Sequence, residues 1–150
     1  MKRIICITLL VSLFFTLFSC TKDLPSASSV AEVINRELSL GKVYSSLKSE
    51  GEDGYVTDEL REALFSSSLL PLEFAVVLDT QVSARGEVGI FYSDGIATVP
   101  DCIESARKRL DLLSSFSQRE SLVLRYGRAV VYLSFEDCER ARELIDGVFS

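Results

Sequence analysis

The spacing of apolar residues along the chain predicts four helices. Apolar side chains recur three and four positions apart in residues 30–40, after Thr57, in residues 101–116 and after Ser134. This spacing places them on one side of a helix. Ser29, Thr57, Pro100 and Ser134 precede these stretches, and such residues are favoured at helix starts.

A different pattern predicts three strands. Residues 74–78, 87–92 and 129–133 are short runs of apolar, mostly β-branched or aromatic residues, which are typical of strands in a buried sheet. A polar segment containing Arg85 and Gly86 separates the first two runs, and a hairpin is the simplest connection between them. Residues 41–55 hold Gly51, Gly54 and several serines, and the pattern predicts a loop there with at most a short turn.

The resulting element order is helix, helix, strand, strand, helix, strand, helix. This order predicts an α+β protein, a two-layer sandwich in which the helices pack on one face of a three-stranded, mainly antiparallel sheet. We expect strand order 2-1-3, with the first strand in the middle. The order 1-2-3, in which the second and third strands pair directly in parallel, stays open. We expect one domain, residues 29–150.

The first twenty residues have the pattern of a bacterial lipoprotein signal. Lys2 and Arg3 precede an apolar run over residues 4–18, which is shorter than the ~20 residues that cross a bilayer. Leu17-Phe18-Ser19-Cys20 resembles a lipobox, in which the chain is cut between Ser19 and Cys20 and the Cys20 thiol carries the lipid. An ordinary secretory signal that ends in cysteine is the alternative.

This signal predicts both the location of the protein and its partner at the membrane. Residues 1–19 would be removed, and residues 20–28 would form a flexible tether. We expect a lipid-anchored protein on the extracytoplasmic face of the cell membrane, or in an outer membrane if the host has one. Two or three acyl chains anchor a protein stably, where one chain alone is marginal.

Composition excludes several kinds of chemistry. The chain has no histidine, so Ser-His-Asp and Cys-His catalysis and histidine-ligated metals are excluded. Removal of the signal takes Lys2 and Arg3 from the 16 basic residues, which leaves 14 against 22 acidic residues and a net charge of −8. An acidic chain repels nucleic-acid phosphates. We therefore expect no nucleic-acid partner, and we expect no metal and no cofactor.

Five further residues are candidates for a bridge or a ligand contact. Cys6 leaves with the signal and Cys20 is lipidated, so Cys102 and Cys138 remain as an even pair that can form a disulfide in an oxidising compartment. Two buried free thiols are the alternative. Arg85, in the hairpin connection, can hold an anionic ligand. Tyr92 and Tyr132 are amphipathic enough to line a binding surface, although strand tyrosines mostly cap a core.

The mature sequence also resembles a family. The segments "TDELREAL", "FAVVLDTQVSARGEVGIFYSD", "CIESARKRLDLL" and "RAVVYLSFEDCERARELI", behind a lipobox, resemble the small lipoproteins grouped as domain of unknown function 4358. The resemblance supports the fold and the location, and it implies no catalytic role for any residue.

These observations predict a non-enzymatic binding or accessory module. We expect an envelope protein or a small ligand to meet the exposed face of the sheet. Two alternatives stay open: a small enzyme that uses carboxylates alone, and a structural surface lipoprotein without a dedicated ligand. A pocket that holds two carboxyl groups ~5–10 Å apart would favour the enzyme.

Overall fold

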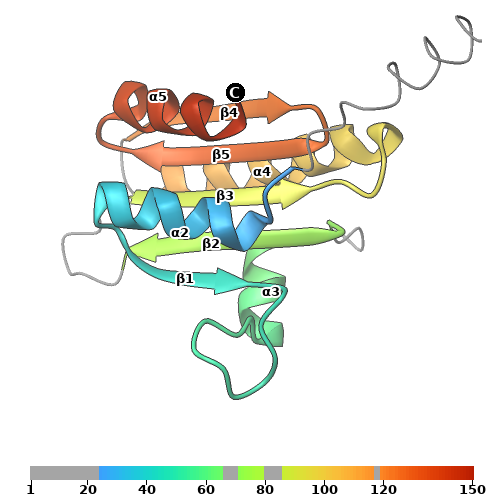
Figure 1. Ribbon diagram of the computed structural model, residues 1–150. Coiled ribbons are helices and arrows are strands. Elements are labelled where there is room, and N and C mark those ends of the chain that lie inside the picture. The colour runs from blue at the N-terminus through green and yellow to red at the C-terminus, as the bar shows by residue number, and fades with distance from the viewer. Residues whose placement is uncertain (1–23, 66–70, 80–85, 117–118) are drawn as a thin grey trace, which may run out of the picture.

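The computed structural model describes residues 24–65, 71–79, 86–116 and 119–150. The chain forms a central sheet with helices on both sides (Figure 1). In chain order the elements are α2 (Ala27–Leu38), β1 (Gly41–Ser45), α3 (Asp58–Leu64), β2 (Glu73–Asp79), β3 (Gly86–Tyr92), the 3-10 turn η1 (Ile96–Thr98), α4 (Val99–Ser114), β4 (Glu120–Tyr126), β5 (Ala129–Phe135) and α5 (Cys138–Phe149).

The α+β class is confirmed, but the layer arrangement differs from the prediction. The sheet has five strands in the order β1-β2-β3-β5-β4, and every neighbouring pair is antiparallel. Helices α2 and α5 cover one face, and α3 and α4 cover the other (Figure 1). The protein is therefore a three-layer sandwich, and the sheet lacks the bare face on which we expected a ligand to bind.

The predicted strands correspond to β2, β3 and β5. The hairpin of β2 and β3 is confirmed. The order 2-1-3 is wrong, because β3 lies between β2 and β5. The alternative order 1-2-3 is the observed order of these three strands. Its parallel pairing is wrong, since α4 leads first into β4, a strand that we did not predict. The tight turn at Gly127, with φ 61°, then returns the chain as β5, antiparallel to both β3 and β4.

The other missed strand is β1. Residues 41–45, predicted as loop, pair with β2 at the opposite edge of the sheet. The loop after β1 returns to the strand at Gly54, whose carbonyl oxygen accepts a hydrogen bond from the Ser45 N–H at 3.0 Å. A Cβ at Gly54 would lie 2.3 Å from the Val43 carbonyl oxygen, so this close approach requires glycine.

The helix starts follow the expected capping chemistry with some shifts. The Thr57 side chain accepts from the Leu60 N–H and begins α3, as predicted. Helix α2 begins at Ala27, capped by Ser26 and not by Ser29, so residues 27 and 28 of the predicted tether are helical. Helix α5 begins at Cys138 with Asp137 as its cap, because β5 extends through Ser134 to Phe135.

The sheet separates two cores. Every residue of β3 is buried, and successive side chains point to opposite faces. Val88 and Ile90 pack with α2 and α5, whereas Phe91 packs with α3 and α4. A strand that is buried on both faces is the signature of a sheet covered on both sides.

Candidate functional site

The first described residues are fixed to one end of the sheet. The Tyr92 hydroxyl, at the end of β3, donates a hydrogen bond to the Pro25 carbonyl oxygen. The Ala27 N–H donates to the Glu73 carboxylate at the start of β2. We call these two contacts the N-terminal clamp. Tyr92 is 8% exposed, so the structure places it under the N-terminal segment and not on a ligand surface.

Removal of the Tyr92 hydroxyl is expected to weaken the clamp in a pH-dependent way. Burial, and then the negative charge of Glu73, raise the pKa of Tyr92 to about 12. The folded state therefore holds this proton more tightly than the unfolded chain. The resulting stability is complete below pH ~10 and is lost as the pH rises from 10 to 12, by about 2 kcal/mol.

The variant Tyr92→Phe tests this linkage. At pH 8 it should lose about 1 kcal/mol of unfolding free energy with the hydrogen bond to Pro25. Above pH 10 its stability should fall less steeply than that of the wild type. Because the loss of about 2 kcal/mol exceeds the initial difference of about 1 kcal/mol, the two curves should converge and cross before pH 11.5. Urea unfolding at pH 8 and at pH 11.5 measures both quantities, and parallel curves would contradict the assigned role.

A second polar network lies inside the core beneath α4. The Glu87 carboxylate of β3 accepts from Arg109 Nε at 2.8 Å and Arg109 Nη2 at 2.7 Å. It also accepts from the Tyr132 hydroxyl at 2.6 Å, and Arg109 Nη1 donates to the Ala63 carbonyl oxygen at 3.2 Å. This arrangement joins β3, β5, α4 and the end of α3.

The network accounts for the position of Tyr132. Its side chain is fully buried, and burial, followed by the charge of Glu87, raises its pKa well above the ordinary value. Its ring lies against Gly89, its partner on the neighbouring strand, and packs edge-on at 5.3 Å from the Phe91 ring. The structure therefore places Tyr132 in the core and not on a binding surface.

The two cysteines lie on opposite sides of the sheet. Both Cys102 and Cys138 are buried free thiols. Cys102, on α4, belongs to the core shared with α3, whereas Cys138, on α5, belongs to the core shared with α2. A disulfide needs Cα atoms within about 7 Å, and the sheet lies between these two residues. The expected bridge is not formed.

A small pocket opens beside Cys102, where β3 leads into α4. Its volume is about 150 Å³. Ser93 and Thr98 share a hydrogen bond between their hydroxyl groups at 2.5 Å, and burial raises the pKa of the Cys102 thiol. The thiol is therefore held in its neutral, less nucleophilic form. The pocket is lined by Phe65, Pro71, Phe91, Ser93, Asp94, Thr98, Asp101, Cys102 and Ser105.

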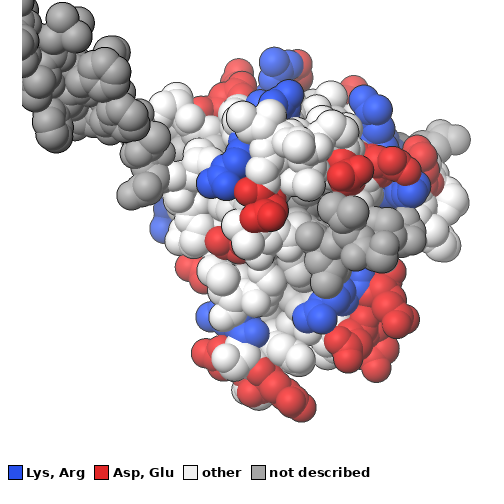
Figure 2. Space-filling model, turned by 90° about the vertical axis from the view of Figure 1, so that its right-hand side faces the viewer, with Lys and Arg blue, Asp and Glu red and all other residues white. Residues whose placement is uncertain are grey.

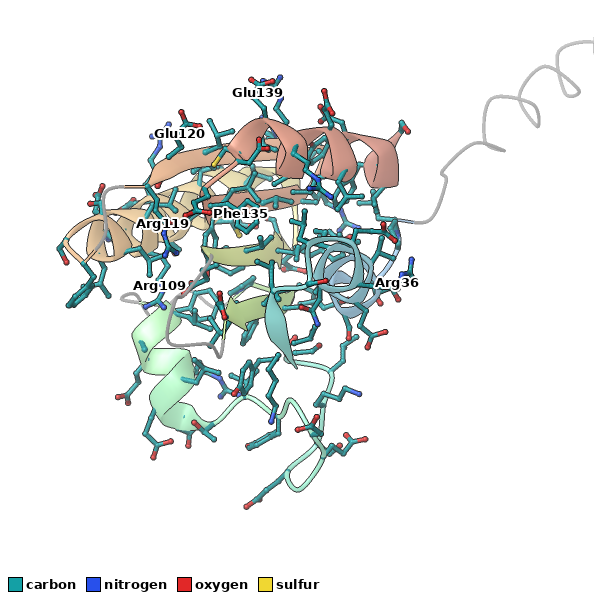
Figure 3. The ribbon with its side chains drawn as sticks, turned by 90° about the vertical axis from the view of Figure 1, so that its left-hand side faces the viewer. Arg36, Arg109, Arg119, Glu120, Phe135 and Glu139 are labelled. Carbon is teal, nitrogen blue, oxygen red and sulfur yellow. The ribbon has the colours of Figure 1, made fainter. Side chains whose placement is uncertain are left out.

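A larger hollow lies at the other end of the domain, between the C-terminus of α2 and the N-terminus of α5. We call it the distal hollow, because β5 and α2 both run from the clamp end toward it. Its volume is about 340 Å³, and Leu38 and Phe135 supply its apolar lining. Figure 3 looks onto this end, with Phe135 and Glu139 labelled. The charged lining residues are Glu37, Glu136, Asp137 and Arg140.

Several predicted site residues lie outside the part of the chain that the structure describes. These are Ser19 and Cys20 of the predicted cleavage site, and Arg85 of the β2–β3 connection. Within the described residues, no three His, Cys, Asp or Glu side chains are grouped so as to hold a metal ion. None of the described helices is both long and apolar enough to span a bilayer.

The sequence analysis missed Glu73 and Glu87 as organising residues. The signal for Glu87 was present, because it is the only charged residue in the run "GEVGIFY", and a lone carboxylate in a buried strand requires a partner. Nothing comparable marks Glu73, whose partner is a backbone N–H.

Comparison with known proteins leaves the geometry as the basis for a functional argument. No family model matches the chain, and no curated protein or solved structure matches it significantly.

Proposed function

We propose that this protein is a lipid-anchored binding module on the extracytoplasmic side of a membrane, with its acyl chains on Cys20. The N-terminal clamp is the observation that carries the proposal. It fixes the chain to the sheet from Pro25 onward, only a few residues after the cysteine of the lipobox. A domain that begins so soon after a predicted acylation site is suited to being held at a surface.

The distal hollow supports the binding role. At about 340 Å³ it falls within the range of small-ligand sites, ~300–1,000 Å³. It also lies at the end of the domain away from Pro25, which a tether at Cys20 leaves accessible. An envelope protein side chain or a small ligand is the expected occupant.

One observation bears on the alternative of a carboxylate enzyme. Asp94 and Asp101 both line the pocket beside Cys102, and paired carboxyl groups are the minimum for acid–base hydrolysis. That pocket holds about 150 Å³, roughly half the lower limit for small-molecule sites. The small size of this pocket makes the binding module the better proposal.

Acylation in the native host tests the anchoring. A fatty-acid probe should label the wild type and place it in the membrane fraction, and Cys20→Ala should lose both properties completely. Cys6→Ala, which changes a cysteine inside the signal, is the matched control and should be labelled normally. An unlabelled wild type released from the membrane would instead favour the ordinary secretory signal. Co-purification from the same detergent-solubilised membranes then identifies what the domain binds.

A further inference from the structure

We propose that the clamp end of the domain rests on the lipid surface, with Leu24, Leu72 and Ile96 in contact with the bilayer interface. This inference deepens the proposed function and rests on acylation of Cys20. It assigns to this end of the molecule a second, non-covalent membrane contact and therefore gives the domain one orientation on the membrane.

Hydrogen bonds place the three side chains at the same end of the sheet. Tyr92 holds Pro25, which follows Leu24, and the Leu72 N–H donates to the Tyr92 carbonyl oxygen at 2.8 Å. The next residue, Ser93, donates its N–H to the Arg128 carbonyl oxygen at 3.0 Å. The turn η1 with Ile96 follows directly. Figure 1 shows the start of α2, the end of β3 and the start of α4 together on its right-hand side.

These side chains are unusually exposed for their type. Leu24 is 41% exposed, Leu72 64% and Ile96 71%. They make up three of the six large hydrophobic residues that are strongly exposed among the described residues. Apolar side chains gain free energy when they leave water, and insertion into the headgroup boundary is one way in which a peripheral domain removes them from it.

The length of the tether brings this end close to the bilayer. Cys20 and Leu24 are four positions apart in the sequence, and a fully extended chain of that length spans at most ~14 Å. The lipid-bearing cysteine sits near the base of the headgroup layer, which is roughly 6 Å thick on each side. No more than ~8 Å then separates Leu24 from the surface, and the clamp determines which end of the domain is nearest.

Apolar side chains, and not the net charge of the domain, favour binding of the clamp end to a lipid surface. Figure 2 faces this end and shows acidic and basic side chains interspersed around an uncharged area. Arg125 and Arg128 are exposed on either side of the β4–β5 turn, and residues 121–135 contain no acidic residue. Two arginines at the interface attract anionic headgroups, and the apolar side chains would supply the rest of the contact.

A single tryptophan can report the orientation, since the chain has none of its own. Ile96→Trp places the reporter at the clamp end. Phe116→Trp is the matched control, because Phe116 is 80% exposed and follows α4 at the other end of the domain. Leu72→Trp is a second reporter at the clamp end. All three positions are on the surface, so the substitutions should leave the fold intact.

The acylated full-length product is reconstituted into phosphatidylcholine–phosphatidylglycerol vesicles that carry bromine on their acyl chains. In vesicle-bound protein isolated by flotation, we expect at least threefold stronger quenching of tryptophan fluorescence in Ile96→Trp and Leu72→Trp than in Phe116→Trp. Equal quenching at both ends in acylated, vesicle-bound protein would overturn the orientation and leave the anchor intact. An intact mass without acyl chains would refute the proposed function itself, and the docking proposal would fall with it.

Discussion

Replacing Glu87 with alanine is expected to lower the free energy of unfolding by about 3–5 kcal/mol, the usual cost of removing one partner of a buried ion pair. Glu87 is 7% exposed, and Tyr132 is fully buried. The side chain of Arg109 is 13% exposed. Without the carboxylate, the guanidinium keeps the Ala63 carbonyl as a partner but loses its counter-charge, and the Tyr132 hydroxyl loses the Glu87 carboxylate as its acceptor. Urea unfolding followed by circular dichroism measures the difference.

A second ion pair on the same helix provides the control. Glu104 and Lys108 lie 2.7 Å apart on α4, and their side chains are 65% and 49% exposed. Glu104→Ala should therefore change stability by no more than about 0.5 kcal/mol. The triple variant Glu87→Leu, Arg109→Met, Tyr132→Phe leaves no buried charge and should recover most of the loss. If Glu87→Ala and Glu104→Ala have equal effects, the network does not stabilise the fold.

The features that the sequence predicted correctly depend on local chemistry. Thr57 begins α3 because its hydroxyl accepts from the Leu60 N–H three residues ahead. The β2–β3 hairpin joins two runs of apolar residues that are neighbours along the chain. Interactions of this kind leave a pattern within a few residues, so they can be predicted without the tertiary fold.

The errors lie at the two edges of the sheet. Strand β1 contains only Val43 and Tyr44 as apolar residues, because an edge strand is partly exposed and needs few. Strand β4 carried a detectable signal: Leu122 and Leu124 alternate toward the core of α2 and α5, while Val123 faces the core of α4. Omission of β4 had a large consequence, since this strand reverses the direction of β5 and so changes the order of the whole sheet.

The ligand-contact roles expected for the two tyrosines were wrong, because a single sequence does not show what covers a strand. Tyr92 and Tyr132 both lie on strands that the sequence pattern predicted. The N-terminal segment covers Tyr92, and α4 covers Tyr132. Their cover comes from segments far away in the chain. Local sequence shows which face of a strand a tyrosine occupies, but not whether a helix from elsewhere covers that face.

The position of Tyr132 also predicts a large effect of the smallest substitution in β3. A Cβ added at Gly89 would lie 2.0 Å from Tyr132 Cε1 and 2.4 Å from Tyr132 Cζ. The ring cannot swing aside, because its hydroxyl is bound to Glu87 and its edge packs against Phe91. Gly89→Ala is therefore expected to lower the free energy of unfolding by about 3 kcal/mol, at the upper end of the cost of overpacking a core.

A second glycine provides the control, because alanine there adds a methyl group without a steric clash. Gly147 lies within α5, and a Cβ there would meet no atom within 4 Å. Gly147→Ala should therefore stabilise the protein, by about 0.5–1 kcal/mol, because alanine loses less conformational freedom in a helix than glycine does. Opposite shifts of the two variants in parallel thermal unfolding experiments are the expected result. A neutral Gly89→Ala would mean that the Tyr132 ring has room to move, and it would also weaken the case for a rigid network around Glu87.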